Sequence, residues 1–273
     1  MNPTRRLHDL GQSIWLDNIT RGILNDGTLA KYIADCNVTG LTSNPSIFDK
    51  AISGGTDYDD AIAALIAEGR QGEELFFALA LQDLTRAADL FKPAHAASHG
   101  VDGFVSLEVS PLLADQTQAT IDSAVALHAK GRRDNLFIKI PGTPAGVPAI
   151  EESIYRGVPI NVTLLFSREQ YLASVEAWMR GIERRIAEGK SPNVESVASI
   201  FVSRWDVAVA DRVPAELKDR LGVAVAIKTY VAYRELLASE RWQRLAAAAA
   251  VPRRRRAAAS ARRRAAPGRR RRS

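Results

Sequence analysis

The chain has 273 residues, 46% of them hydrophobic, a size and composition that suit one large α/β barrel or two small domains around a sizeable core. Its single cysteine, Cys36, excludes an intrachain disulfide and suits a reducing cytosol. The net charge of +6 arises at one end, because the last 28 residues hold 11 arginines and no acidic residue, so that the rest of the chain carries a net charge of −5.

Taken in chain order, the sequence predicts short strands that alternate with amphipathic helices. The strands are expected at residues 13–17, 40–45, 102–109, 136–141, 160–166 and 197–203. The helices are expected at residues 7–10, 29–35, 58–68, 73–91, 115–130, 145–155, 167–188, 205–212 and 224–245. Four residues are expected to cap helices or turns, because their side-chain oxygens can accept hydrogen bonds from free backbone N–H groups. They are Thr28, Ser46, Asp115 and Ser167.

This alternation, with short connections, predicts a parallel sheet with right-handed crossovers. Two architectures satisfy it, a doubly wound sheet and a (β/α)₈ barrel. No glycine-rich G-x-G-x-x-G sequence follows any expected strand, so a dinucleotide-binding fold has no support.

One expected strand, Leu136–Pro141, contains a single lysine, Lys139, in an otherwise apolar run. Burial of a lysine disfavours its charged form, and a neutral amine is a nucleophile that can form a Schiff base with a carbonyl group. The alternative is a lysine at the edge of the sheet, whose stem packs and whose ammonium reaches water.

Polar residues recur on one face of the expected strands, mostly near the carboxyl ends. They are Asp17, Thr42 with Asn44, Ser106 with Glu108, Lys139, Asn161 with Thr163, and Ser199 with Ser203. In a barrel these faces converge on the interior, and catalysis takes place at the mouth formed by the carboxyl ends. The recurrence favours the barrel and a catalytic role for Lys139.

Six short motifs carry a resemblance to a known family. They are SIWLD (13–17), GLTSNPSIF (40–48), VSLEV (105–109), IKIPGT (138–143), INVTLLFS (160–167) and ASIFVSR (198–204). In this order the chain, from about Pro3 to Ala248, resembles the transaldolases of bacteria, enzymes of the pentose phosphate pathway with the fold of class I aldolases. The fold so implied is a (β/α)₈ TIM barrel.

The resemblance implies a role for each matching polar residue. Lys139 would form the Schiff base, Glu108 and Thr163 would hold and activate a water for proton transfer, and Asp17 would act as acid and base at the bond that breaks. The implied contacts with substrate are those of Asn44 and Asn161 with its hydroxyl groups, and of Ser199 and Arg204 with its phosphate.

The activity so implied is transfer of a dihydroxyacetone unit from a ketose phosphate, such as sedoheptulose 7-phosphate, to glyceraldehyde 3-phosphate. It requires no metal or organic cofactor, because the lysine imine takes up the electrons. An aldolase that cleaves without transfer is the close alternative. His95 and His99 have a spacing that two metal ligands can adopt, but no third ligand is near in sequence, and we interpret them as lying on a solvated helix face.

Four of these site residues also have a structural interpretation. Glu108 and Asp17 could be buried partners of arginines. Asn44, which precedes a proline, could be a turn residue. Arg204 could lie at a solvated helix start.

The resemblance ends near Leu245. Residues 246–273 are mainly alanine and arginine and cannot fill the seventh and eighth strands, so we expect an incomplete barrel of about six strands over 1–245 and a disordered basic tail over 246–273. A GC-rich gene read out of frame would give such a tail. The alternative is an arm that binds nucleic acid non-specifically, which is disfavoured because no aromatic residue lies among the arginines. We expect weak or absent activity from an open barrel.

No targeting or membrane-spanning segment is predicted. Residues 1–11 lack the apolar stretch of a signal peptide, and no apolar run approaches the ~20 residues of a membrane-spanning helix. We therefore expect a cytoplasmic protein that does not contact a membrane. Its oligomeric state is left open.

Overall fold

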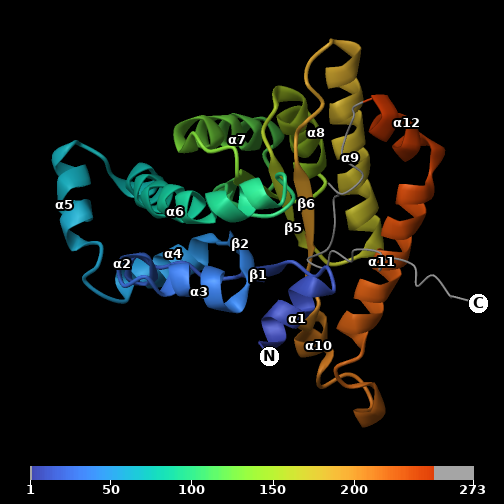
Figure 1. Cartoon of the computed structure of the whole chain (residues 1–273), viewed down its shortest axis with the longest axis horizontal. Helices are drawn as coiled ribbons and strands as arrows, with labels where there is room; N and C mark the ends of the chain where they lie inside the picture. The colour runs from blue at the N-terminus through green and yellow to red at the C-terminus, as the bar shows by residue number, and fades with distance from the viewer. Residues whose placement is uncertain (1, 249–273) are drawn as a thin grey trace, which may run out of the picture.

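The computed structural model describes residues 2–248, and within this range six strands form one parallel sheet (Figure 1). The strands are β1 (Ile14–Leu16), β2 (Val38–Thr42), β3 (Phe104–Glu108), β4 (Leu136–Pro141), β5 (Ile160–Leu165) and β6 (Ser196–Ile200). The helices are α1 (Pro3–Asp9), α2 (Arg21–Asn25), α3 (Thr28–Cys36), α4 (Pro45–Ser53), α5 (Asp59–Ala67), α6 (Gly72–Ala97), α7 (Thr117–Gly131), α8 (Gly146–Arg156), α9 (Arg168–Ala187), α10 (Ser203–Val209), α11 (Leu221–Ala238) and α12 (Glu240–Ala248).

The strands lie in the sheet in the same order as in the chain, β1-β2-β3-β4-β5-β6. A doubly wound sheet reverses its strand order at a switch point, so this order excludes that architecture. The long helices cover the sheet in turn: α6 packs on β2 and β3, α7 on β4, α8 on β4 and β5, and α9 on β5 and β6. The sheet is thus a curled half-barrel with helices on its outside, which confirms the prediction of an incomplete (β/α)₈ barrel.

The strand register places the polar residues at two levels. At one level, Glu108 of β3 lies opposite Lys139 of β4, which lies opposite Asn161 of β5. At the level two residues earlier along β3, Thr42 of β2 lies opposite Ser106. Because residues two apart on a strand share a face, the side chains of both levels lie inside the curve of the sheet.

Aromatic rings fill the half-barrel below Glu108 and Lys139. Phe137 stacks on Phe104, with ring centroids 4.1 Å apart, and on Trp15 of β1, at 6.2 Å. Each of the three aromatic residues lies two positions before a polar residue in the chain. At Gly40, a Cβ atom would lie 2.5 Å from the Trp15 ring, so this glycine makes room for the indole. The rings form an apolar floor on which the polar groups rest.

Three of the four predicted caps are wrong. Helix α3 begins at Thr28 itself, with Gly27 at the N-cap, and the Thr28 N–H donates to the Asp26 carboxylate. Asn44, not Ser46, caps α4, and α7 begins at Thr117 with Gln116 at its N-cap in place of Asp115. In each case the residue with the right chemistry lies one or two positions from the helix start. Ser167 does cap α9, by accepting from the Gln170 N–H.

Further differences concern whole helices, among them α4, which forms where only a turn was expected. Residues 21–25 form α2, capped by the Thr20 hydroxyl, where no helix was predicted. The single helix predicted over residues 224–245 is instead two, α11 and α12, with Ser239 in an extended conformation between them. No glycine or proline marks this break in the sequence.

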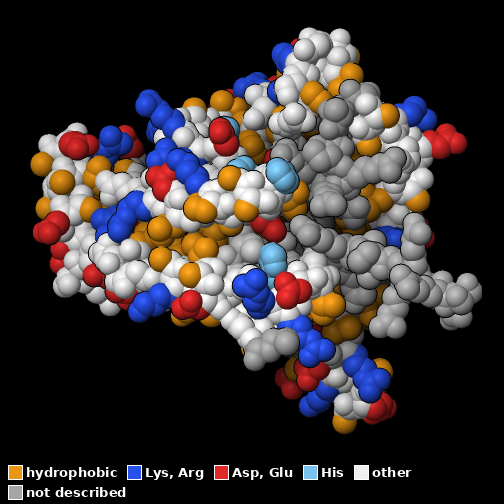
Figure 2. Space-filling view, in the orientation of Figure 1, with side chains coloured by type: hydrophobic (Ala, Val, Ile, Leu, Met, Phe, Trp, Pro, Cys, Tyr) orange, Lys and Arg blue, Asp and Glu red, His pale blue; other side chains and the backbone are white. Residues whose placement is uncertain are grey.

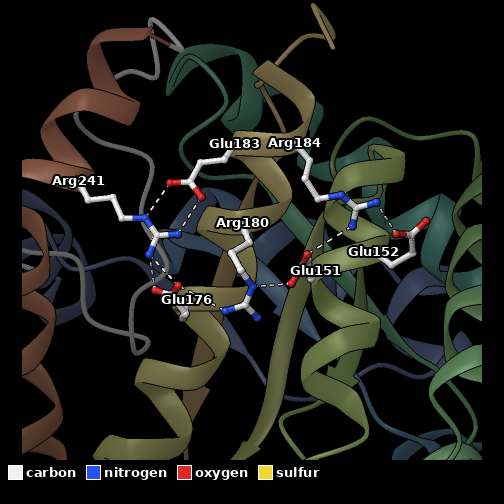
Figure 3. A network of polar contacts seen from close by, with 7 residues as sticks. All are labelled: Glu151, Glu152, Glu176, Arg180, Glu183, Arg184 and Arg241. Carbon is white, nitrogen blue, oxygen red and sulfur yellow. Dashed lines mark hydrogen bonds and ion pairs between the residues drawn. The ribbon is translucent and has the colours of Figure 1, made fainter. Parts of the chain in front are cut away.

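Helix α12 is fixed to the outside of the half-barrel. The Arg241 guanidinium bonds to both oxygens of Glu176 and to both of Glu183 on α9, in a network that reaches α8 through Arg180 and Glu151 (Figure 3). Below it, Trp242 stacks on Trp178 at 5.3 Å. These contacts attach α12 to α9.

On the face shown in Figure 2, basic and acidic side chains are interspersed over α5 and α6 and form no extended basic surface. No helix among residues 2–248 is long and apolar enough to cross a membrane. The predicted disordered tail falls, from residue 249 onward, outside the described residues. Its first three residues, 246–248, belong to α12.

Candidate active site

A cavity of about 560 Å³ opens at the carboxyl ends of the strands. The residues that line it are Ser13, Trp15, Asp17, Thr42, Asn44, Pro45, Ser46, Glu108, Pro111, Lys139, Thr163, Leu164, Val197, Ser199, Ile200, Phe201 and Arg204. They come from every strand of the sheet. Seven of the eight predicted site residues are among them, and Asn161 is the exception.

Lys139 lies in the middle of the sheet and is only 6% exposed. Its Nζ lies 3.0 Å from Glu108 Oε2 and donates to the backbone carbonyl oxygen of Ser43 at 2.8 Å. The interpretation of Lys139 as an edge lysine with its head in water is therefore wrong. Glu108 pairs with this lysine and, within residues 2–248, with no arginine. The carboxylate and the carbonyl replace much of the hydration that burial removes from the amine.

A series of side-chain hydrogen bonds crosses the sheet beside this pair. Asn161 Nδ2 donates to Ser106 Oγ at 3.0 Å, and Asn161 Oδ1 accepts from Ser199 Oγ at 2.9 Å. Asn161 is 1% exposed and lies behind the cavity wall, with both ends of its amide engaged. Its contact with substrate stays a prediction, and what the geometry shows is that it orients Ser199.

Two charged residues stand at the rim on opposite sides of the half-barrel. Asp17 follows β1 and is exposed, so it is not the buried partner of an arginine. Arg204, in the first turn of α10, is also exposed, and its guanidinium lies 5.0 Å from the centroid of the Phe201 ring. Among residues 2–248 neither side chain forms an ion pair. Both remain available to a ligand.

Asn44 caps a helix, and its contact with substrate stays a prediction. Its side chain accepts from the Ile47 N–H and so caps α4, which begins at Pro45. It also lines the cavity. The carbonyl oxygen is engaged in the cap, so the amide nitrogen is the part of the side chain that can serve a substrate hydroxyl.

The backbone beside Thr163 is strained. Leu164 has a φ of 55°, a left-handed conformation that costs a residue with a Cβ roughly 1–2 kcal/mol. The register between β5 and β6 shifts at this point, between Val162 and Leu165. The bulge gives Leu164 39% exposure at the cavity, next to the Thr163 hydroxyl. Strain of this kind is typical of functional sites.

The cavity also holds an unsatisfied polar atom. Thr42 Oγ1 is buried without a hydrogen-bond partner in the described part of the chain. A buried hydroxyl of this kind costs about 1–3 kcal/mol until it is paired.

Neither histidine behaves as predicted for a solvated helix face. His95 packs edge-on against Phe104 at 4.8 Å, and its Nδ1 contacts the Asp102 carbonyl oxygen at 2.8 Å. His99 lies beyond the end of α6, with a φ of 53°. In residues 2–248, no group of three His, Cys, Asp or Glu side chains is arranged to hold a metal ion.

Three residues that shape the site were not predicted from the sequence. Trp15 was predicted only as an apolar strand residue, although its position two before Asp17 places it on the inner face. The strain at Leu164 and the carbonyl of Ser43 left no signal, because they are properties of the backbone. The strain lies at the bulge near the end of β5, and the carbonyl lies in the turn that follows β2.

Comparison with known proteins gives consistent matches. Residues 14–256 match the family model described as transaldolase/fructose-6-phosphate aldolase. The chain is 46% identical over 252 residues to a transaldolase of Arthrobacter sp. (strain FB24), covering 89% of this chain and 68% of that protein. A transaldolase of Renibacterium salmoninarum is 44% identical over 251 residues, covering 89% and 67%. A protein named transaldolase 2 from Nostoc sp. is 38% identical over 264 residues, covering 90% and 69%.

Proposed function

Because the chain belongs to the transaldolase and fructose-6-phosphate aldolase family, and within it to the bacterial transaldolases, we propose that it transfers a dihydroxyacetone unit between sugar phosphates through an imine on Lys139. The donor is a ketose phosphate such as sedoheptulose 7-phosphate, and the acceptor is glyceraldehyde 3-phosphate. The observation that carries the proposal is a buried lysine amine that reaches a cavity rimmed by a carboxylate and a guanidinium, neither of which forms an ion pair within residues 2–248.

The amine of Lys139 starts the reaction. It gives up a proton and adds to the ketone carbon of the donor, and loss of the ketone oxygen as water leaves an iminium. The positive nitrogen then accepts the electron pair of the neighbouring carbon–carbon bond as that bond breaks. An aldose phosphate departs, and a three-carbon enamine stays bound to the lysine.

Two carboxylates divide the proton transfers. Glu108, 3.0 Å from the amine, and Thr163, which lines the same cavity, hold and activate the water that exchanges protons while the imine forms and hydrolyses. Asp17, across the cavity at the rim, removes the proton of the hydroxyl at the bond that breaks and returns it when the acceptor aldehyde adds to the enamine. Their separate positions suit two separate tasks.

We assign the phosphate of the substrate to the side of the cavity that β6 forms. Arg204 offers there a guanidinium that has no ion-pair partner in the described part of the chain, which suits a phosphate dianion. Ser199, held by Asn161, offers a hydroxyl on the same side. With the phosphate at Arg204 and the carbonyl carbon at Lys139, a sugar phosphate lies across the cavity.

Product analysis tests the proposal and separates transfer from simple cleavage. The chain is incubated with sedoheptulose 7-phosphate, with and without glyceraldehyde 3-phosphate. We expect fructose 6-phosphate only when the acceptor is present, and loss of that product in Lys139→Met. Free dihydroxyacetone formed equally without an acceptor would indicate an aldolase. Product formed at the same rate by Lys139→Met would overturn the role of the lysine.

A further inference from the structure

The buried amine of Lys139 has two acceptors of different kinds. One is the Glu108 carboxylate at 3.0 Å, which can take up a proton, and the other is the Ser43 backbone carbonyl at 2.8 Å, which cannot. Ser43 lies just beyond β2, two strands from β4, and does not line the cavity. Its carbonyl therefore reaches the amine from the sheet side.

The position of this carbonyl is fixed by the Ser43 side chain. The Ser43 hydroxyl donates to the backbone carbonyl oxygen of Ser106 at 2.7 Å, which joins the end of β2 to β3, and Ser43 is fully buried. On its other side, Asn44 is held by the cap of α4. The carbonyl is thus held between two fixed points before any substrate arrives.

The tetrahedral geometry of an amine nitrogen gives this contact a consequence. When both N–H bonds of the neutral amine donate, one to Ser43 and one to Glu108, the lone pair takes the remaining direction. Lys139 faces the cavity, so that direction is where a substrate carbonyl carbon lies. When the lone pair is fixed in this direction, the amine does not have to lose its rotation about the Cε–Nζ bond before it attacks.

We infer that the Ser43 carbonyl positions the Lys139 amine for attack and then accepts the one N–H that the iminium retains. During imine formation the nitrogen gains a bond to carbon and loses its other proton, which leaves with the departing water. The remaining N–H⁺ needs an acceptor that stays neutral, and the carbonyl provides it. Glu108 is thereby free to move protons. Ser43 is a positioning residue, and the inference rests on the proposed imine chemistry.

Borohydride trapping with fructose 6-phosphate measures imine formation directly, because hydride adds to the iminium carbon and makes the link to Lys139 permanent. In Ser43→Ala, which keeps the carbonyl but frees it, we expect the maximal trapping rate to fall on the order of tenfold to a hundredfold. The substrate concentration for half-maximal trapping stays unchanged. Ser43→Thr, which keeps the hydroxyl, restores the rate.

Ser196→Ala is the matched control. The Ser196 hydroxyl also joins two strands, by donating to the Ile160 carbonyl oxygen at 2.8 Å, and Ser196 is also buried, but it lies at the start of β6, away from the amine. We expect this variant to lose a comparable amount of thermal stability and to trap at the normal rate.

A second variant keeps the inference testable if Ser43→Ala does not fold. An ester in place of the Ser43–Asn44 peptide bond retains all side chains and makes the Ser43 carbonyl a weaker acceptor, so trapping should again slow. Normal trapping rates in both the ester and Ser43→Ala would overturn the inference. Failure of the unmodified chain to trap substrate at all would instead contradict the proposed function.

Discussion

At the scale of single residues, the site depends on which charges are paired and which are free. Lys139 and Glu108 are mutually paired and nearly buried, and removing one of them would leave the other as an uncompensated charge, at a cost of about 3–5 kcal/mol. Asp17 and Arg204 are exposed, and within residues 2–248 they form no ion pair. The paired groups suit chemistry on the amine, and the free groups suit binding and the proton transfer at a distant hydroxyl.

Asp17→Asn should separate imine formation from bond cleavage. The variant keeps Lys139 and Glu108 but has no base for the hydroxyl proton, so the imine forms and the carbon–carbon bond stays intact. After borohydride treatment with fructose 6-phosphate, mass spectrometry should find an intact phosphorylated six-carbon adduct in place of a three-carbon one. A three-carbon adduct formed at the normal rate would show that Asp17 is not the base.

His128 on α7 should make the chain sensitive to mild acid. Burial lowers the pKa of this imidazole, and its Nε2 has no partner in the described residues. Below the ordinary histidine pKa of about 6.5, the unfolded chain therefore binds a proton that the folded chain does not, and stability falls as the pH falls.

The measurement is the melting temperature at pH 7.5 and pH 5.5. The melting temperature of His128→Gln should fall less from pH 7.5 to pH 5.5 than that of the unmodified chain. His8→Gln, at a side chain that is 40% exposed, is the control, and its melting temperature should fall as much as that of the unmodified chain. An equal loss in all three proteins would exclude His128 as the cause.

The residues of the site differ in how far sequence could predict them. The face that carries Glu108, Lys139 and Thr163 follows from strand alternation, because the period of two is a property of the extended chain. Their individual roles came from the resemblance to a family. Ser43 could not be predicted, since its contribution is a carbonyl that any residue type possesses. The same holds for the left-handed conformation of Leu164.

At the scale of elements, α12 has two kinds of contact with α9 that differ in strength. The Arg241 ion pairs are partly exposed, with side-chain exposures of 32% for the arginine and 39% for each glutamate, and solvent weakens them. Trp242 is 5% exposed and stacks on Trp178. The buried stack should therefore dominate the attachment.

Trp242→Ala should lower the free energy of unfolding by about 3–5 kcal/mol, the usual range for removal of a buried aromatic ring. Arg241→Met, which keeps the aliphatic stem, should lower it by about 1 kcal/mol or less. Urea denaturation of both variants checks the order. A larger loss for Arg241→Met would mean that the network of Figure 3 holds the helix.

Element boundaries show why some local predictions failed. Leu136–Pro141 was predicted with the bounds that β4 has, because charged residues before it and a proline and glycine after it limit the apolar run. The break between α11 and α12 was missed because Ser239 is compatible with a helix. The chain changes direction at Ser239, and Trp242, just after this break, packs against α9. Such a tertiary contact leaves no local signal in the sequence.

At the scale of the molecule, the half-barrel has two open edges in the described range, where no strand pairs with the outer side of β1 or β6. Amide hydrogen exchange should therefore be slowest in β3 and β4 and faster in β1 and β6. Equal protection of the edge strands would mean that residues outside 2–248, or a second chain, cover them. Asp17 and Arg204 stand at these edges, and weak turnover stays our prediction for this reason.

The central claim is that Lys139 forms an imine with a ketose phosphate. The most direct test is borohydride reduction in the presence of fructose 6-phosphate, followed by mass spectrometry of the proteolytic peptides. This test requires only that the imine forms and is reduced, and it requires no turnover. Weak turnover by an open barrel therefore does not prevent a result. We predict a single modified peptide, the one that contains Lys139, and no adduct in Lys139→Met. An adduct on another lysine, or one that persists in Lys139→Met, would contradict the account.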